Sequence, residues 1–205
     1  MPIDTSASLR DVAVDILWRQ WRALGAAATG RPVEKQVDLE VLILASLEFE
    51  PLEPRLWTVM VDWLRVSARL SSVQRLKNLV GQFSRAGEML PRLASFVTRE
   101  SGDARWRSLG RSSARRGKAP APARERAAGP TLESPPALML RLRAAFGVGV
   151  KADLLAFLLG QRVRVSVATV ASALGHSKAT VFRALQDLLE AGMIRTTPTT
   201  TASEY

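Results

Sequence analysis

Two short helical patterns, each followed by a glycine, lie in the stretch 167–197 and constrain the fold more than any other feature of the chain. Gly175 follows the first pattern. Because glycine enters the left-handed conformation without a Cβ penalty, the chain can leave a helix there. Ser177 comes next, and its hydroxyl can cap a second helix by accepting a hydrogen bond from a backbone N–H. Gly192 ends the second pattern, and Met193–Thr197 then has the composition of a strand. This order predicts a helix-turn-helix followed by a β-wing.

The second of these helices, expected over about 178–190, has one face that must be buried. Val181, Leu185 and Leu188 recur at i, i+4 and i+7 and therefore share that face. The side chains expected on the opposite face are Lys178, Phe182, Arg183 and Gln186. In a major groove, lysine and arginine suit guanine and glutamine suits adenine, so the outer face predicts a DNA-reading helix. The alternative interpretation is an ordinary helical hairpin whose outer face is solvated.

Contacts to the DNA backbone are expected at both ends of this helix. Ser177 and Thr180 lie where unpaired N–H groups and the positive end of the helix dipole favour a phosphate. Arg195, Thr197 and Thr199 fall in the expected strand and turn after the helix, where we expect them to touch flanking phosphates. The sequence therefore predicts double-stranded DNA as the partner, with base contacts from the helix and backbone contacts around it.

The C-terminal part resembles the winged helix-turn-helix transcriptional regulators, the broad group that includes the MarR, ArsR and GntR families. The residues that carry the resemblance are Ala171, Leu174, Gly175, Ser177, Thr180, Val181, Arg183, Ala184, Leu185, Leu188, Gly192 and Ile194. The resemblance covers 150–205 and implies a homodimer that reads a palindromic or repeated site. It also implies a preceding helix and strand, for which Lys151–Leu159 and Arg162–Ser166 are suitable. The sequence departs from the group at His176, in a turn position that is often apolar, and at Tyr205, where a second wing strand is only starting.

The charge of the chain also favours a polyanionic partner. Lysine and arginine number 29 against 19 acidic residues, a net charge of +10. The segments 1–98, 99–135 and 136–205 carry +1 (12 basic, 11 acidic), +5 (9 and 4) and +4 (8 and 4) respectively. Excess positive charge attracts nucleic acid by Coulomb attraction and counterion release. An anionic membrane surface fits less well, because no basic amphipathic helix with a large apolar face accompanies the charge.

The N-terminal half is predicted to be an α-helical domain over 1–98, so the fold class is mainly α. Apolar spacing and breaks by proline, glycine and serine predict helices from Ser6 or Ser8 to about Leu24, then over Val37–Phe49, Arg55–Leu70, Val73–Ser84 (capped by Ser71 or Ser72) and Met89–Val97. Dimerisation, sensing of a small-molecule effector and contact with a partner protein all remain open as roles for this half.

Two groups of residues in this half have both a structural and a functional interpretation. The four tryptophans are Trp18, Trp21, Trp57 and Trp63. Aromatic clusters can stack bases or line a ligand pocket, but the helical spacing favours a place in the core. The acidic group comprises Asp38, Glu40, Glu48, Glu50 and Glu53. A metal site is the functional interpretation of these carboxylates, and a solvated helix face is the favoured one.

The segment 99–136 is rich in arginine, alanine, proline, glycine and serine, and we expect it to be a flexible basic linker. A basic arm that follows phosphates or enters a minor groove is the alternative, and the two are compatible. Its cations would be Arg105, Arg107, Arg111, Arg115, Arg116 and Lys118. A helix over Ala137–Phe146 is expected to begin the C-terminal domain, 137–205, and to pack on the winged module or on a second subunit.

Little in the sequence indicates catalysis. His176 is the one histidine, and we expect a surface or half-buried turn residue or at most a phosphate contact. Phosphate-binding glycine loops and the HExxH zinc motif do not occur, and the chain has no cysteine, so we expect no enzyme activity, cofactor or metal. Neither a secretory signal nor a membrane-spanning run is found, which favours the cytoplasm. A winged module that binds protein, or a non-specific nucleic-acid-binding component of a larger complex, is the alternative function. A metal-dependent enzyme that uses paired carboxylates is a less favoured alternative.

Overall fold

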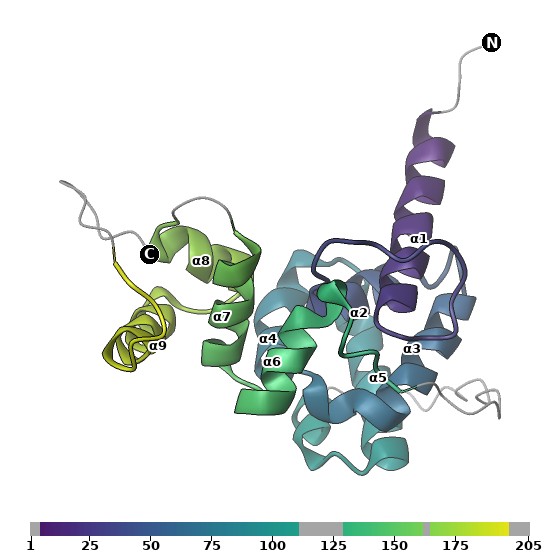
Figure 1. Ribbon diagram of the computed structural model, residues 1–205. Helices are drawn as coiled ribbons and strands as arrows, with labels where there is room; N and C mark the ends of the chain where they lie inside the picture. Colours follow the sequence, from purple (N-terminus) through teal and green to yellow (C-terminus); the bar gives the residue numbers. More distant parts are fainter. Residues whose placement is uncertain (1–4, 111–128, 162–164, 197–205) are drawn as a thin grey trace. The chain divides into compact units, whose positions relative to one another are not determined.

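The chain divides after Ala137 into two compact units, which we call unit 1 (Met1–Ala137) and unit 2 (Leu138–Tyr205). A computed structural model describes residues 5–110, 129–161 and 165–196, with side chains from Leu9 onward (Figure 1). Over these residues the fold is mainly helical, as predicted, with no extended strand and a single β-bridge residue, Ser166. None of the described helices is long and apolar enough to cross a membrane.

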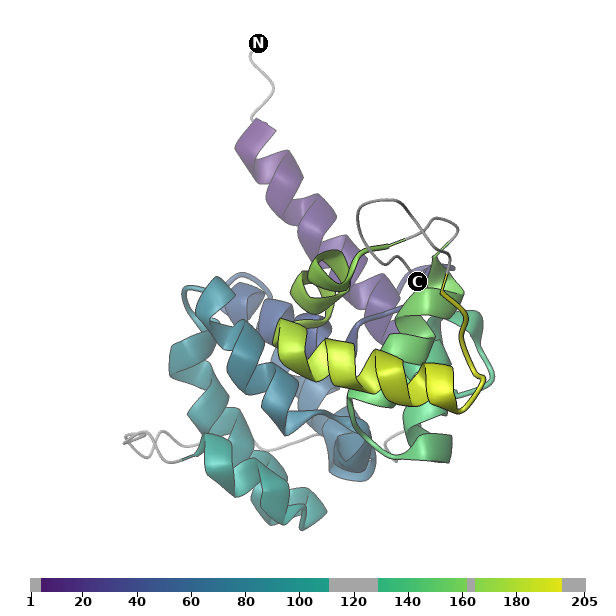
Figure 2. The same ribbon diagram turned by 90° about the vertical axis from the view of Figure 1, so that its left-hand side faces the viewer.

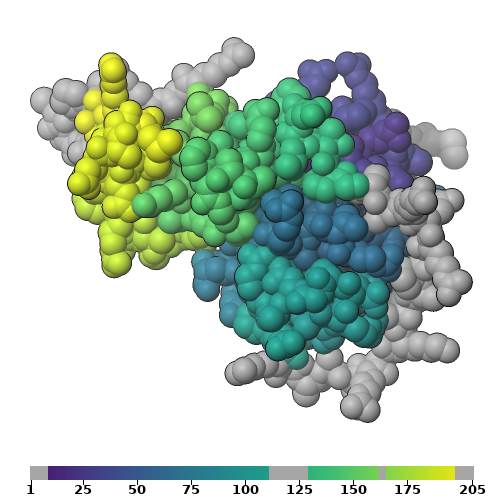
Figure 3. Space-filling view, turned by 60° about the horizontal axis from the view of Figure 1, so that its bottom comes forward, coloured from purple at the N-terminus to yellow at the C-terminus, as the bar shows by residue number. Residues whose placement is uncertain are grey.

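Unit 1 contains five α-helices and four short 3₁₀ turns among its described residues. They are α1 (Thr5–Ala23), α2 (Leu39–Phe49), α3 (Arg55–Ser67), η1 (Ala68–Leu70), α4 (Val73–Leu79), η2 (Val80–Gln82), α5 (Ala86–Ser101), η3 (Ala104–Leu109) and η4 (Pro135–Ala137). In the space-filling view α5 and η3 (teal) lie against the earlier helices α3 and α4 (blue) (Figure 3). The first four helices follow the prediction closely. The fourth is capped by Ser72, whose hydroxyl accepts from the N–H of Arg75 at 3.3 Å.

Tryptophan side chains form the centre of unit 1, so the core interpretation of these residues is confirmed. Trp18, Trp21, Trp57 and Trp63 are all buried. The indole N–H of Trp21 donates to Ser46 Oγ at 2.9 Å, and that of Trp63 donates to the Leu24 carbonyl at 3.0 Å. Both indole N–H groups therefore have a hydrogen-bond partner inside the core. Burial of these two rings thus stabilises the unit without leaving a polar atom unpaired.

The acidic group around α2 is not the solvated face that we expected. Glu40 is buried and pairs with the buried guanidinium of Arg75, which also donates to Asp38. Glu48 accepts from Ser84 Oγ and from the backbone N–H groups of Arg85 and Ala86, so it caps the start of α5. This remote cap explains why α5 begins three residues before the predicted 89–97. Its end at Ser101 is followed by Gly102, which has φ of +74°. The described residues contain no cluster of three or more histidine or acidic side chains that could hold a metal ion.

The described parts of the expected linker are packed, which corrects the prediction for them. Residues 99–101 belong to α5, and the following η3 buries Trp106 completely. On the far side, Thr131 N donates to the Leu24 carbonyl at 3.2 Å, and Val37 N donates to the Pro136 carbonyl at 2.9 Å. The buried Trp106 and these backbone hydrogen bonds thus hold residues 99–110 and 129–136 against the rest of unit 1, although the composition of these segments alone indicates disorder. Residues 111–128, with four of the six cations assigned to the basic arm, lie outside the described residues.

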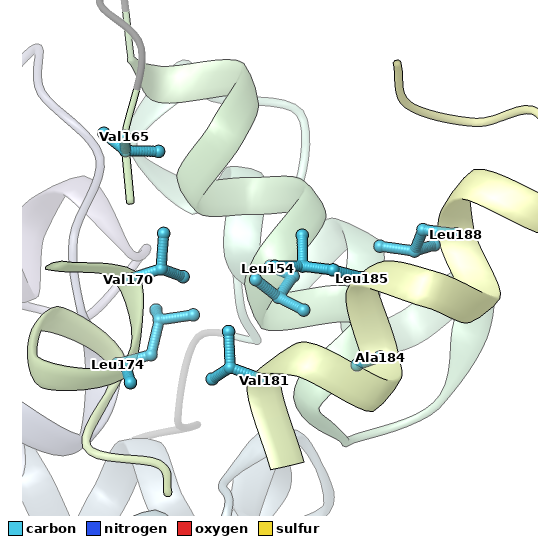
Figure 4. Packing of buried hydrophobic residues seen from close by; sticks show 9 residues of the cluster. Leu154, Val165, Val170, Leu174, Val181, Ala184, Leu185 and Leu188 are labelled. Atoms are coloured by element: carbon cyan, nitrogen blue, oxygen red, sulfur yellow. The ribbon is translucent and has the colours of Figure 1, made fainter. Parts of the chain in front are cut away.

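The described residues of unit 2 form four helices: α6 (Leu138–Phe146), α7 (Val150–Gly160), α8 (Val167–Leu174) and α9 (Lys178–Glu190). Helix α6 contacts α7, and α7 contacts both α8 and α9. The shared core receives Leu154 from α7, Val170 and Leu174 from α8, and the buried face of α9 (Figure 4). An ion pair lies beside this core. Arg143 Nε donates to Asp153 Oδ1 at 2.7 Å, and both side chains are fully buried.

Candidate nucleic-acid interface

The turn between α8 and α9 is built by two local signals in the sequence. Gly175 has φ of +64° and ends α8, as predicted from its position. Its N–H donates to the Ser172 carbonyl at 3.3 Å, and His176 N donates to the Ala171 carbonyl at 3.0 Å. This pair of bonds is the Schellman motif, which satisfies two carbonyls at the end of a helix.

Ser177 then starts α9 as its N-cap, again as predicted. Its Oγ accepts from the N–H of Thr180 at 3.2 Å and lies 2.8 Å from Thr180 Oγ1. Gly192, with φ of +69°, ends the helix, and Met193 N donates to the Leu188 carbonyl at 2.9 Å. A cap at one end and a second Schellman turn at the other therefore fix the length of α9 at the predicted Lys178–Glu190.

The inner face of α9 fixes which of its side chains meet the solvent. Val181, Leu185 and Leu188 are buried as predicted, together with Ala184, and they point toward the side chains of α7 and α8 in Figure 4. The outward side chains predicted as a binding face are all exposed. They are Ser177, Lys178, Thr180, Phe182, Arg183 and Gln186. The structure thus brings together on one helix the residues that sequence reasoning assigned to DNA contact.

Positive charge is concentrated in the first half of this outer face. Neither Lys178 nor Arg183 has an ion-pair partner among the described residues, whereas Asp187 is paired with Lys151 of α7 at 2.9 Å. Glu190 carries a negative charge at the other end of the helix. The first N–H groups of a helix also present partial positive charge. An anion is therefore attracted to the N-terminal half of α9 and not to its C-terminal half.

The described part of the predicted wing, residues 193–196, contains no strand. Met193–Thr196, expected to form a strand, have no strand conformation, and Arg195 and Thr196 are exposed. A strand needs a partner for its backbone groups, and the Met193 N–H is instead used in the turn that ends α9. Thr197 and Thr199 lie outside the described residues, as do three residues of the expected partner strand Arg162–Ser166.

His176 was expected to be a surface or half-buried turn residue, or at most a phosphate contact, and it is half-buried in the turn. Its side chain is 9% exposed, and its Nε2 lies 3.6 Å from Asp153 Oδ2. The carboxylate of Asp153 therefore lies between Arg143 of α6 and His176, and His176 directly precedes Ser177, the N-cap of α9. Sequence reasoning missed this link. The available signal was a pair of opposite charges, Arg143 and Asp153, each set among apolar residues.

A comparison with protein families agrees with this geometry. A model of the MarR family matches residues 149–202, which span α7, α8 and α9. The match indicates a DNA-binding transcriptional regulator and supports the MarR resemblance, but it gives no support to ArsR or GntR and covers none of unit 1. Searches of curated proteins and of solved structures give no match.

Proposed function

We propose that this protein is a sequence-specific, double-stranded DNA-binding transcriptional regulator whose α9 enters the major groove. The observation that carries the proposal is the division of α9 into a buried apolar face and an exposed face with two cations, neither of which has an ion-pair partner in the described part of the chain. The activity is binding and not catalysis, and its place is the cytoplasm. Two copies related by a twofold axis would present two α9 helices to a palindromic or repeated site.

Each exposed side chain of α9 has a role suited to its chemistry. Lys178 and Arg183 donate to guanine, and Gln186 bonds adenine in a bidentate manner. Phe182, of which 49% is exposed, meets the methyl group of thymine. The free N–H groups at the helix start, beside Ser177 and Thr180, bind a phosphate, and Arg195 together with the residues after it grips the flanking backbone.

A protein-binding role for unit 2 is the second candidate. The observation that favours it is a set of exposed apolar side chains among its described residues: Phe146, Leu159, Phe182 and Met193. Phe182 serves either role. A protein partner would bury the apolar side chains and gain little from Lys178 and Arg183, so binding through these two cations favours DNA.

Selection of bound sites from random duplex DNA tests the proposal directly, since specific enrichment would also give the half-site spacing. The double variant Lys178→Ala/Arg183→Ala should then lose affinity for the selected site. One lost guanine contact costs about 1–3 kcal/mol, which is about 5-fold to 150-fold in affinity. Each lost phosphate contact should reduce the slope of log K against log salt by about 0.9.

A matched control removes the same two charges elsewhere. Arg69→Ala/Lys77→Ala also loses one arginine and one lysine, both exposed and both in unit 1. This variant should retain affinity for the site and nearly all of the salt dependence. Equal loss in both double variants would mean that net charge, and not the face of α9, controls binding. Unchanged binding by Lys178→Ala/Arg183→Ala would overturn the role of α9.

A further inference from the structure

Helix α1 has two apolar faces, and just one of them is covered. Leu17, Trp18 and Trp21 face the core of unit 1. On the other side, Leu9, Val12 and Ile16 are 66%, 53% and 41% exposed. These three lie at i, i+3 and i+7, the spacing of a seam between two packed helices. The first turns of α1 also extend beyond the other helices of unit 1, as Figures 1 and 2 both show.

A groove lies at the end of this seam that is nearer the core. It has a volume of about 510 Å³ and runs between α1 and the segment 31–36, with Ile16 and Gln20 on one side and Pro32 and Val33 on the other. Leu9, at the projecting end, is seven residues from Ile16, which is about 10 Å along a helix. The polar or charged residues Arg19, Arg31, Glu34, Lys35 and Gln36 complete the lining, so Ile16, Pro32 and Val33 are its apolar part. One face of α1 thus carries a projecting apolar side chain at one end and a groove with an apolar part at the other.

We propose that a second copy of this chain covers the face, with the two α1 helices antiparallel. A twofold axis near Val12 would place Leu9 of each copy in the groove beside Ile16 of the other, because such an axis exchanges the two ends of the face. The seam is one self-complementary surface, which is what a symmetric pair of subunits requires.

The charges beside the seam favour a second copy over other partners. The charged side chains at the seam and its groove are Asp15, Arg19, Arg31, Glu34 and Lys35, which sum to +1. Arg19 already pairs with Asp15 at 3.6 Å, and Arg31 pairs with Glu34 at 3.1 Å. A nucleic acid or an anionic membrane therefore gains little electrostatic attraction here. This interface gives the proposed homodimer its surface, but it lies in unit 1 and its test needs no DNA. Failure of the interface would leave DNA binding by α9 untouched.

Sedimentation of the full chain over a range of micromolar concentrations tests the interface. The wild type should reach twice the mass of one chain. Val12→Glu should weaken the dimer by roughly tenfold or more, because two carboxylates then face each other across the axis. Val66→Glu is the matched control, since Val66 lies on α3 with 47% exposure, and it should leave the dimer unchanged. A monomeric wild type, or a Val12→Glu variant that forms the dimer as tightly as the wild type does, would overturn the proposal.

Two mixing experiments make the result independent of folding defects and define the orientation. Val12→Glu mixed with Val12→Lys should form a mixed dimer that is tighter than the dimer of either variant alone. The chain contains no cysteine, so introduced cysteines are unique. Leu9→Cys mixed with Ile16→Cys should form a mixed disulfide, while Leu9→Cys alone should not. Cross-linking of Leu9→Cys to itself, without the mixed product, would overturn the antiparallel arrangement.

Discussion

Removal of the buried carboxylate of Asp153 should destabilise unit 2 without affecting unit 1. Arg143 and Asp153 are both fully buried, with Nε and Oδ1 2.7 Å apart. Removing one partner of a buried pair costs about 3–5 kcal/mol, because the other charge stays in the interior without it. At about 0.05–0.15 kcal/mol per residue, a unit that spans 138–205 has a total stability of about 3–10 kcal/mol. Asp153→Ala should therefore remove a third or more of that stability.

The distribution of tryptophan provides an internal control for this measurement. All five tryptophans of the chain lie in unit 1. Urea unfolding followed by tryptophan fluorescence therefore reports on unit 1, and its midpoint should be the same in wild type and Asp153→Ala. Amide hydrogen exchange, followed by mass spectrometry of peptides from α6, α7 and α9, reports on unit 2 and should be faster in the variant.

A double variant separates the loss of a pair from the loss of packing. Arg143→Met/Asp153→Leu replaces both charges by apolar side chains, which is often neutral or stabilising for a buried pair. The amide hydrogens of unit 2 should therefore exchange more slowly in this double variant than in Asp153→Ala. The reasoning would be refuted if Asp153→Ala lost less than about 1 kcal/mol of protection, or if the double variant were the less stable of the two.

Two further substitutions have defined expectations. Burial by itself raises the pKa of Glu48, but hydrogen bonds from Ser84 Oγ and from the N–H groups of Arg85 and Ala86 outweigh burial and lower the pKa below its ordinary value. The carboxylate of Glu48 thus stabilises unit 1 above its unfolded-state pKa and loses that effect as the pH falls through the folded-state pKa. The unfolding midpoint of Glu48→Gln should accordingly be lower than that of the wild type at pH 7, and the difference should shrink in acid. In unit 2, Gly192→Ala should destabilise the end of α9 by about 1–2 kcal/mol through the positive φ alone, since no atom lies within 4 Å of the added Cβ. Exchange in peptides from α9 measures this loss, and Gly149→Ala, where φ is extended, should cost less.

The helix-turn-helix could be predicted because its signals are local. Gly175 and Gly192 are needed where φ is positive, and Ser177 is needed one residue before α9. Each requirement is met within a few residues of sequence, so the bounds of α9 follow from the sequence alone. A wing strand has no such local code, because its hydrogen bonds depend on a partner strand that is remote in the chain. The expectation for Met193–Thr196 was accordingly wrong.

The buried ion pairs were the other feature that the sequence analysis did not predict. Arg75 and Glu40 are 35 residues apart and Arg143 and Asp153 are ten apart, so neither pair falls on one helix face. Patterns of hydrophobicity assign each charged side chain to solvent, and only the packed fold shows that these four are inside. The same limit applies to Trp106. One apolar residue in a segment rich in arginine and serine gives no periodicity, although its ring is fully buried.

The exposed face of α9 was predicted from the residues left over once the buried face had been assigned. This reasoning predicts which side chains are exposed, but it does not identify what they bind. Once Val181, Leu185 and Leu188 are assigned to the core, the geometry of a helix leaves Lys178, Arg183 and their neighbours outside. Exposure itself names no ligand. What favours duplex DNA is the mixture on that face, in which exposed cations lie beside an apolar ring, since a major groove offers both guanine acceptors and thymine methyl groups. A partner protein would have to leave those cations solvated or supply carboxylates for them. The salt dependence of binding therefore distinguishes the two partners more directly than affinity does.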